Sequence, residues 1–151
     1  MKKTVNYLNE LVLSYNKRLF SNTAVNTSIA AVSIAQEIYK QTDSKIDLKE
    51  YFFVIMLNRG NLTIGYLKVS EGGISETSVD IKLIFATALK CLATNLILVH
   101  NHPSGKLLPS QQDIKVTKGI IQAAEYFDIN VLDHIILSSD GFYSFADERM
   151  L

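Results

Sequence analysis

Two histidines separated by one residue, His100 and His102, directly follow an apolar run at positions 96–99. If that run is a strand that continues through them, both side chains point to the same face of the sheet. Imidazole nitrogen is a common zinc ligand, and two imidazoles on one face can occupy two positions of a tetrahedral site. Because the chain has only three histidines, this pair is the first candidate for metal chemistry.

A carboxylate, Asp113, follows His102 by eleven residues, and the interval contains Pro103, Gly105 and Pro109. These residues favour a turn, so the chain can double back and start a helix at Ser110 whose first turn points at the histidines. Asp113 would then complete a set of two histidines and one acid. The fourth position of a tetrahedral metal would stay open for water, as in catalytic zinc sites.

Each of these residues also has a purely structural interpretation. A His-x-His pair can be a hydrogen-bonded pair in the core, and Pro103 can serve only to force the turn. Ser110 and Asp113 fit a helix capping box in outline, with Asp in place of the usual Glu. The combination of all four polar residues at set positions nevertheless favours a metal site.

The remaining pattern predicts alternating helices and strands in one domain, with helices covering a mixed sheet. Asn26 or Thr27 is the expected cap of the first helix, and Ser78 is the expected cap of the second. Two glycines mark an expected loop at 70–75. The predicted helices are 26–41, 78–93 and 110–127. The predicted strands are 51–57, 62–69, 96–99, 130–137 and 142–145.

Composition restricts the class of protein. The 151 residues suit one domain with a sizeable core. Because 15 basic residues balance 15 acidic ones, the composition lacks the excess of positive charge that is typical of nonspecific nucleic-acid binding. The single cysteine, Cys91, excludes an internal disulfide and is expected to be a small buried residue. No apolar run approaches the ~18 residues of a membrane span, and we expect a cytoplasmic protein. The basic pairs Lys2-Lys3 and Lys17-Arg18 are expected on a solvated arm.

The spacing His100-x-His102, then Ser110 and Asp113, resembles the JAMM metalloprotease pattern of JAB/MPN domains. The surrounding sequence is similar to the bacterial RadC-like branch over residues 27–151. The segments that carry this resemblance are GGISETSVDIKLIFATALK (72–90), HNHPSG (100–105), PSQQD (109–113), LDHIIL (132–137) and YSFADE (143–148). The resemblance implies an α/β (α+β) fold. It would be a single JAB/MPN domain of the cytidine-deaminase-like layered type, with a mixed central sheet flanked by helices, preceded by an N-terminal arm at 1–26.

The resemblance also implies roles for individual residues. His100, His102 and Asp113 would hold zinc, Glu50 would exchange protons with water and leaving group, and Ser110 would stabilise the oxyanion. The implied activity is a zinc metallopeptidase or isopeptidase. Judged from the residues alone, an ordinary solvated residue at a strand mouth is the better interpretation of Glu50, and the resemblance favours the catalytic role. Glu71 and Glu76 compete with it for the same role.

Two other functions compete with the hydrolase. One is a DNA-repair-associated accessory protein, as the traditional label of the RadC family suggests, and the other is a catalytically idle scaffold. The balanced charge weighs against the first, as does the expected absence of a helix-hairpin-helix segment upstream. We therefore expect a protein or peptide substrate, no strong nucleic-acid binding, no membrane association and a possible homodimer. Asp133 and His134 are adjacent on a strand and point to opposite faces, so we expect them to support the core rather than bind the metal.

Overall fold

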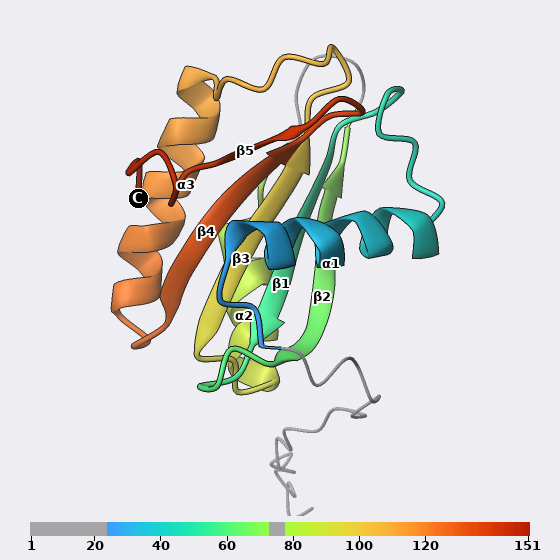
Figure 1. Cartoon of the computed structure of the whole chain (residues 1–151). Coiled ribbons are helices and arrows are strands. Elements are labelled where there is room, and N and C mark those ends of the chain that lie inside the picture. The colour runs from blue at the N-terminus through green and yellow to red at the C-terminus, as the bar shows by residue number, and fades with distance from the viewer. Residues whose placement is uncertain (1–23, 73–77) are drawn as a thin grey trace, which may run out of the picture.

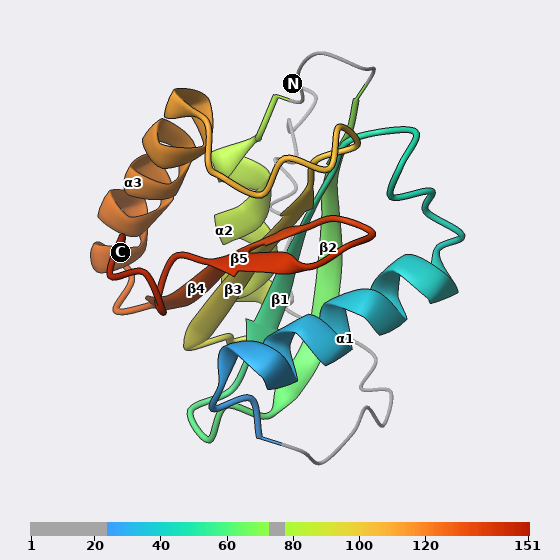
Figure 2. The same cartoon turned by 45° about the horizontal axis from the view of Figure 1, so that its top comes forward.

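A five-stranded mixed sheet in the order β2-β1-β3-β4-β5 forms the centre of the molecule. The computed structural model describes residues 24–72 and 78–151. Helix α1 covers one face of the sheet, and α2 and α3 lie on the other (Figures 1 and 2). The helices are α1 (Ser28–Gln41), α2 (Ile81–Lys90) and α3 (Gln111–Glu125). The strands are β1 (Tyr51–Leu57), β2 (Thr63–Glu71), β3 (Asn95–Asn101), β4 (Asn130–Leu137) and β5 (Phe142–Ser144). The predicted fold class, a single domain with helices around a mixed sheet, is confirmed.

The mixed character of the sheet comes from one parallel pair. Strand β3 pairs parallel with β4, whereas the neighbouring pairs β1–β2, β1–β3 and β4–β5 are antiparallel. A parallel pair needs a crossover connection, and α3 supplies it between β3 and β4. The chain therefore leaves the C-terminal end of β3, turns, and enters α3 close to that same end of the sheet.

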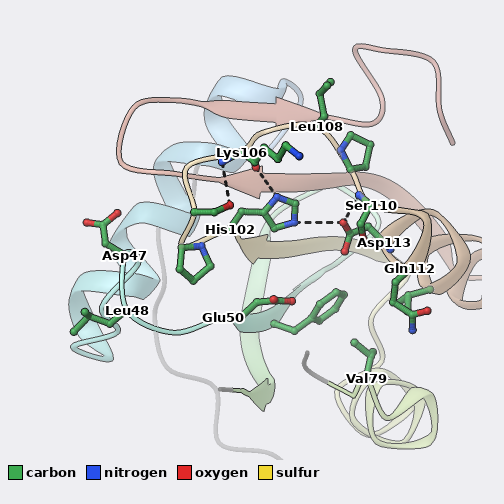
Figure 3. Close-up of a pocket in the computed structure, with 15 residues that line it drawn as sticks. Asp47, Leu48, Glu50, Val79, His102, Lys106, Leu108, Ser110, Gln112 and Asp113 are labelled. Carbon is green, nitrogen blue, oxygen red and sulfur yellow. Dashed lines mark hydrogen bonds and ion pairs between the residues drawn. The ribbon is translucent and has the colours of Figure 1, made fainter. Parts of the chain in front are cut away.

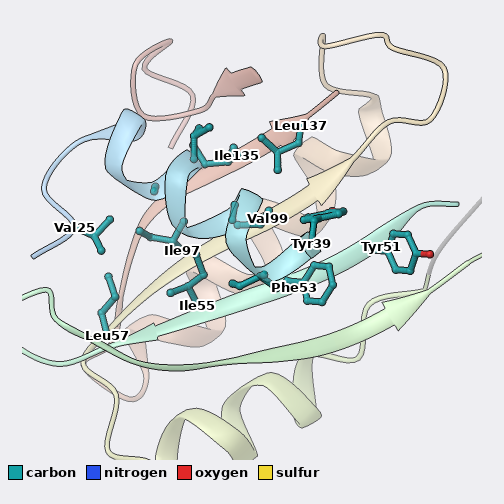
Figure 4. Close-up of a cluster of buried hydrophobic side chains, with 14 residues drawn as sticks. Val25, Tyr39, Tyr51, Phe53, Ile55, Leu57, Ile97, Val99, Ile135 and Leu137 are labelled. Carbon is teal, nitrogen blue, oxygen red and sulfur yellow. The ribbon is translucent and has the colours of Figure 1, made fainter. Parts of the chain in front are cut away.

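Side chains of β3 alternate between two hydrophobic cores. Ile97 and Val99 pack with α1, as Figure 4 shows, and Leu96 and Leu98 pack with α2 and α3 on the other face. All seven residues of β1 and all seven of β3 are buried, because each strand is covered on both faces. The same alternation places the next residue, His100, on the face of α3.

The expected cap of α1 is confirmed as Thr27, whose side chain accepts a hydrogen bond from the Ala30 backbone. The expected cap of α2 is wrong. Asp80 caps this helix in place of Ser78, because its carboxylate accepts from the backbone N–H groups of Lys82 and Leu83. Helix α2 ends at Lys90, and Cys91 is its buried C-cap.

Two strands extend beyond their predicted C-terminal ends. Strand β3 extends beyond position 99 to Asn101, because His100 pairs with both Phe52 of β1 and Ile136 of β4. Strand β2 extends to Glu71, so the predicted loop at 70–75 begins later. Most of the predicted N-terminal arm, with both basic pairs, and Glu76 lie outside the described residues. No helix within 24–72 and 78–151 is long and apolar enough to cross a membrane.

We expect Phe53→Ala to lower the free energy of unfolding by about 3–5 kcal/mol, because the substitution leaves a cavity in the α1 core. Phe53 is fully buried and its ring contacts those of Tyr39 and Tyr51. Urea denaturation followed by circular dichroism measures the change. The control Ile29→Ala removes a side chain that is 69% exposed on α1 and should change stability by less than about 0.5 kcal/mol. Equal effects of the two substitutions would contradict the assignment of this core.

Candidate metal centre

Three potential ligands converge where the end of β3 meets the start of α3. The Nε2 atoms of His100 and His102 are 2.9 Å apart, and they lie 3.1 and 3.3 Å from the two carboxylate oxygens of Asp113. Ligand atoms on a tetrahedral zinc with bonds of ~2.05 Å are separated by about 3.3 Å. The three side chains therefore form a group that could hold a metal ion.

The turn between β3 and α3 brings these ligands together. The backbone N–H of His102 donates to the carbonyl of Leu137, which fixes the residue just beyond the end of the strand. Gly105 donates its backbone N–H to the carbonyl of His102 and has a φ of +79°, a conformation that favours glycine. The chain then reverses, and α3 begins with Asp113 in its first turn.

Asp113 belongs both to the helix cap and to the ligand group. Its Oδ2 accepts a hydrogen bond of 2.6 Å from the backbone N–H of Ser110, and its own backbone N–H donates to Ser110 Oγ. This is a complete capping box. The structural and the metal-binding interpretations of this pair are thus compatible, because a carboxylate has enough lone pairs for both contacts.

The electrostatics of the cluster keep the carboxylate ionised. Burial alone would raise the pKa of Asp113, but contacts with the rings of His100 and His102 and with Ser110 outweigh it and lower that pKa far below its ordinary range. The hydrogen bond with Asp113 raises the pKa of His102 against an opposing effect of burial. An ionised carboxylate beside two imidazoles is one of the donor sets that catalytic zinc sites use.

The Nδ1 atom of each imidazole also has a hydrogen-bond partner. His102 Nδ1 contacts the backbone carbonyl of Lys106, which can only accept, so the ring donates there and Nε2 is free to act as a ligand. His100 Nδ1 lies 2.7 Å from Nε2 of His134, a fully buried residue of β4. Burial lowers the pKa of His134 well below its usual value, and the nearby His100 lowers it further. Metal-binding histidines characteristically have such partners, which orient the ring.

Asp133 and His134 do face opposite sides of the sheet, as the sequence predicts. The Asp133 carboxylate accepts hydrogen bonds from the Ser144 hydroxyl and the Ala146 backbone, on the side away from the ligand group. It therefore fastens β4 to β5 and the segment that follows β5. His134 contacts His100 and is not itself part of the group that could hold a metal ion.

An open pocket of about 830 Å³ is lined by His102 and Asp113 of the potential ligand group and also by Glu50 and Ser110. In Figure 3 the Glu50 carboxylate points into this pocket beneath the ring of His102. Its negative charge contributes to the raised pKa of His102. Glu71, by contrast, does not line the pocket, and its carboxylate is paired with Lys49 and Lys68.

Asn101, the residue between the two histidines, holds the segment that carries Glu50. Its side chain points to the α1 face, where the oxygen accepts from Tyr39 Oη and the Tyr51 backbone N–H. Its nitrogen donates to the backbone carbonyls of Ile46 and Lys49. Because all four hydrogen-bonding positions of the amide are used, Asn101 ties the chain before β1 to the strand that carries the ligands.

Comparison with known proteins agrees with this architecture. Residues 25–150 match the family described as RadC-like JAB domain. This chain belongs to that family. The RadC-like JAB domain is 48% identical over 99 residues to a UPF0758 protein of Flavobacterium johnsoniae, an alignment that covers 66% of this chain and 43% of the relative.

Two further UPF0758 proteins are similar to this RadC-like JAB domain. The protein of Porphyromonas gingivalis is 43% identical over 104 residues, which cover 68% of this chain and 46% of the relative. The protein of Chlorobium phaeovibrioides is 32% identical over 142 residues, which cover 93% of this chain and 62% of the relative. The chain thus spans less than half the length of the first two relatives. The names state no activity, but the predicted resemblance to RadC-like proteins is confirmed.

Sequence reasoning missed the roles of Asn101 and Thr117 in this JAB domain. Thr117 lies one helical turn after Asp113, and its hydroxyl contacts His134 Nδ1 at 2.6 Å. The i, i+4 spacing of Asp113 and Thr117 was a usable signal, since it places both on one face of α3. No local signal marked Asn101, because the partners of its side chain lie 50 to 62 residues away in the chain.

We expect Asn101→Leu to lower the free energy of unfolding by about 2–4 kcal/mol. The substitution keeps the approximate volume but leaves buried carbonyls and N–H groups without partners. Chemical denaturation measures the loss. A matched control is Asn130→Ala, since Asn130 is exposed and its amide makes one hydrogen bond, to Asn95. A stability of Asn101→Leu equal to that of the control would show that the amide does not hold the segment before β1.

Proposed function

We propose that this chain is a zinc-dependent metallohydrolase that cleaves an amide bond, as a peptidase or isopeptidase. The observation that carries the proposal is the convergence of His100, His102 and Asp113 beside a pocket that also contains Glu50 and Ser110. Membership of the RadC-like JAB domain family supports a metallohydrolase as the general class.

The donor set fits zinc better than a metal that prefers oxygen ligands. Two imidazoles and one carboxylate are typical of catalytic zinc sites, whereas magnesium and calcium select oxygen donors. Bound zinc would act as a Lewis acid toward a carbonyl group and would lower the pKa of water to ~7. His100, His102 and Asp113 would hold it, with their ring partners and the capping box keeping them in place.

Glu50 is the residue we assign to proton transfer. It lies at the mouth of β1, lines the pocket and carries a carboxylate directed toward the ligand side, as Figure 3 shows. A carboxylate in this position can accept a proton from the attacking water and pass it to the leaving nitrogen. Asn101 supports this role, because it fastens the backbone at Lys49, directly before Glu50.

Ser110 is the residue we assign to oxyanion stabilisation. Its Oγ accepts from the Asp113 backbone, so the hydroxyl proton is not used in the capping box. Ser110 lines the pocket and can donate that proton to the negatively charged oxygen that develops on a carbonyl under attack. One such donor can lower a barrier by ~3 kcal/mol.

The walls of the pocket suit a polypeptide substrate. Leu48 and Leu108 are strongly exposed and lie on the two loops that border it, with Phe52 and Val79 deeper along its lining. These apolar side chains offer contacts to an extended chain laid across the ligand group. We therefore assign a protein or peptide as the substrate class.

We expect the purified protein to contain about one zinc per chain after expression in zinc-supplemented medium, because the ligand group offers one site. Elemental analysis measures the content. The double variant His100→Ala, His102→Ala should retain no zinc, whereas Lys106→Ala, which keeps the backbone carbonyl that contacts His102, should retain it. Sites with two histidines and one carboxylate also bind iron, so stoichiometric iron in place of zinc would contradict the hydrolase proposal.

We expect Glu50→Gln to keep the fold and the zinc and to lower amide hydrolysis by ~100-fold or more, because the amide side chain cannot exchange protons. Hydrolysis can be followed with a library of fluorescence-quenched peptides, and zinc content with elemental analysis. Glu71→Gln is the matched control and should retain wild-type activity. If Glu76→Gln lost the activity and Glu50→Gln kept it, the proton-transfer role would belong to position 76.

A further inference from the structure

The ring of His134 is enclosed between His100, a proposed zinc ligand, and helix α3, which carries the proposed ligand Asp113. It is fully buried and packs against Phe145, with ring centroids 4.7 Å apart, and edge-on against Phe52 at 5.6 Å. Its polar contacts are His100 Nδ1 at 2.7 Å and Thr117 Oγ1 at 2.6 Å. Among residues 24–72 and 78–151 no carboxylate is hydrogen-bonded to the ring, and charge is costly in such surroundings, so His134 is a neutral imidazole with one N–H.

The hydrogen-bond partners determine which nitrogen of His134 carries that proton. The Thr117 hydroxyl donates to the backbone carbonyl of Asp113 at 2.6 Å, and a carbonyl can only accept. A hydroxyl has a single proton, so Thr117 must accept from His134 Nδ1–H. Nε2 of His134 is then the unprotonated nitrogen, and it accepts from Nδ1–H of His100.

The hydrogen bond with His134 also determines which nitrogen of His100 carries a proton. Its Nδ1 retains a proton to donate to His134, so Nε2 is the nitrogen left to bind a cation beside His102 and Asp113. We propose that Thr117 and His134 are positioning residues that hold His100 in the tautomer competent to bind zinc. The hydrogen-bonded series runs from His100 through His134 and Thr117 to the backbone of Asp113, and so it links two ligands from behind.

This inference rests on the proposed zinc site. It identifies the contacts that hold His100 in place from the side of α3. His102 has separate support, because a backbone carbonyl fixes its tautomer. A neutral His100 that binds zinc through Nε2 carries its proton on Nδ1. If His134 carried its own proton on Nε2, these two N–H groups would point at each other with no acceptor between them. The Thr117 hydroxyl prevents this, because it offers an acceptor only to Nδ1.

The test compares Thr117→Val with Thr117→Ser in the full chain. Val keeps the shape of the side chain and removes the acceptor, whereas Ser keeps the hydroxyl. Zinc affinity is measured by competition with a chromophoric chelator, and histidine tautomers by nitrogen-15 NMR, which has only three histidines to resolve. We expect zinc affinity to fall ~10–100-fold in Thr117→Val and to stay near wild type in Thr117→Ser. We expect His134 of the wild-type protein to be protonated at Nδ1.

The outcomes separate this proposal from the proposed function. Zinc binding by the wild-type protein together with an Nε2-protonated His134, or with unchanged affinity in Thr117→Val, would overturn the positioning role and leave the zinc site intact. Failure of the wild-type protein to bind zinc would overturn both. If Thr117→Val does not fold, the tautomer in the wild-type protein still decides, and His134→Gln should bind zinc more tightly than His134→Leu because it keeps an acceptor for His100.

Discussion

The contact between the Asp113 carboxylate and two imidazoles is the interaction on which the rest of the site depends. It exists because the end of β3 lies opposite the first turn of α3. The parallel pairing of β3 with β4 requires a crossover, and α3 is that crossover, so the helix starts near the C-terminal end of β3. The ligand group is therefore a direct consequence of the sheet topology.

One carboxylate stabilises both the helix and the ligand group. An acidic residue in the first turn of a helix is favoured by the partial positive charge of the free N–H groups there. The capping box also holds the Asp113 side chain in one orientation, so little conformational freedom remains to be lost when a cation binds. The hydrogen bond that starts α3 thus also organises the proposed metal site before any metal is present.

The tripeptide His100-Asn101-His102 connects both faces of the sheet. The histidines face α3, and Asn101 faces α1, where it fixes the segment that leads to Glu50. One strand end thereby places the two histidines proposed to bind metal and, through backbone contacts, the group proposed to transfer protons. A disturbance on the α1 side is consequently expected to reach the pocket on the other side.

Much of this protein follows from its sequence alone. The apolar runs predicted β1 and β4 with their observed bounds, and the spacing from His100 to Asp113 predicted that these side chains converge, because local periodicity and turn residues carry that information. The sequence left two boundaries undetermined. The full length of β3 depends on its pairing partners, and the start of α2 depends on whether Ser78 or Asp80 caps the helix. Only the tertiary structure placed Glu71 in ion pairs away from the pocket. It alone also brought His134 behind His100, because hydrogen-bond partners more than 30 residues apart in the chain leave no local pattern.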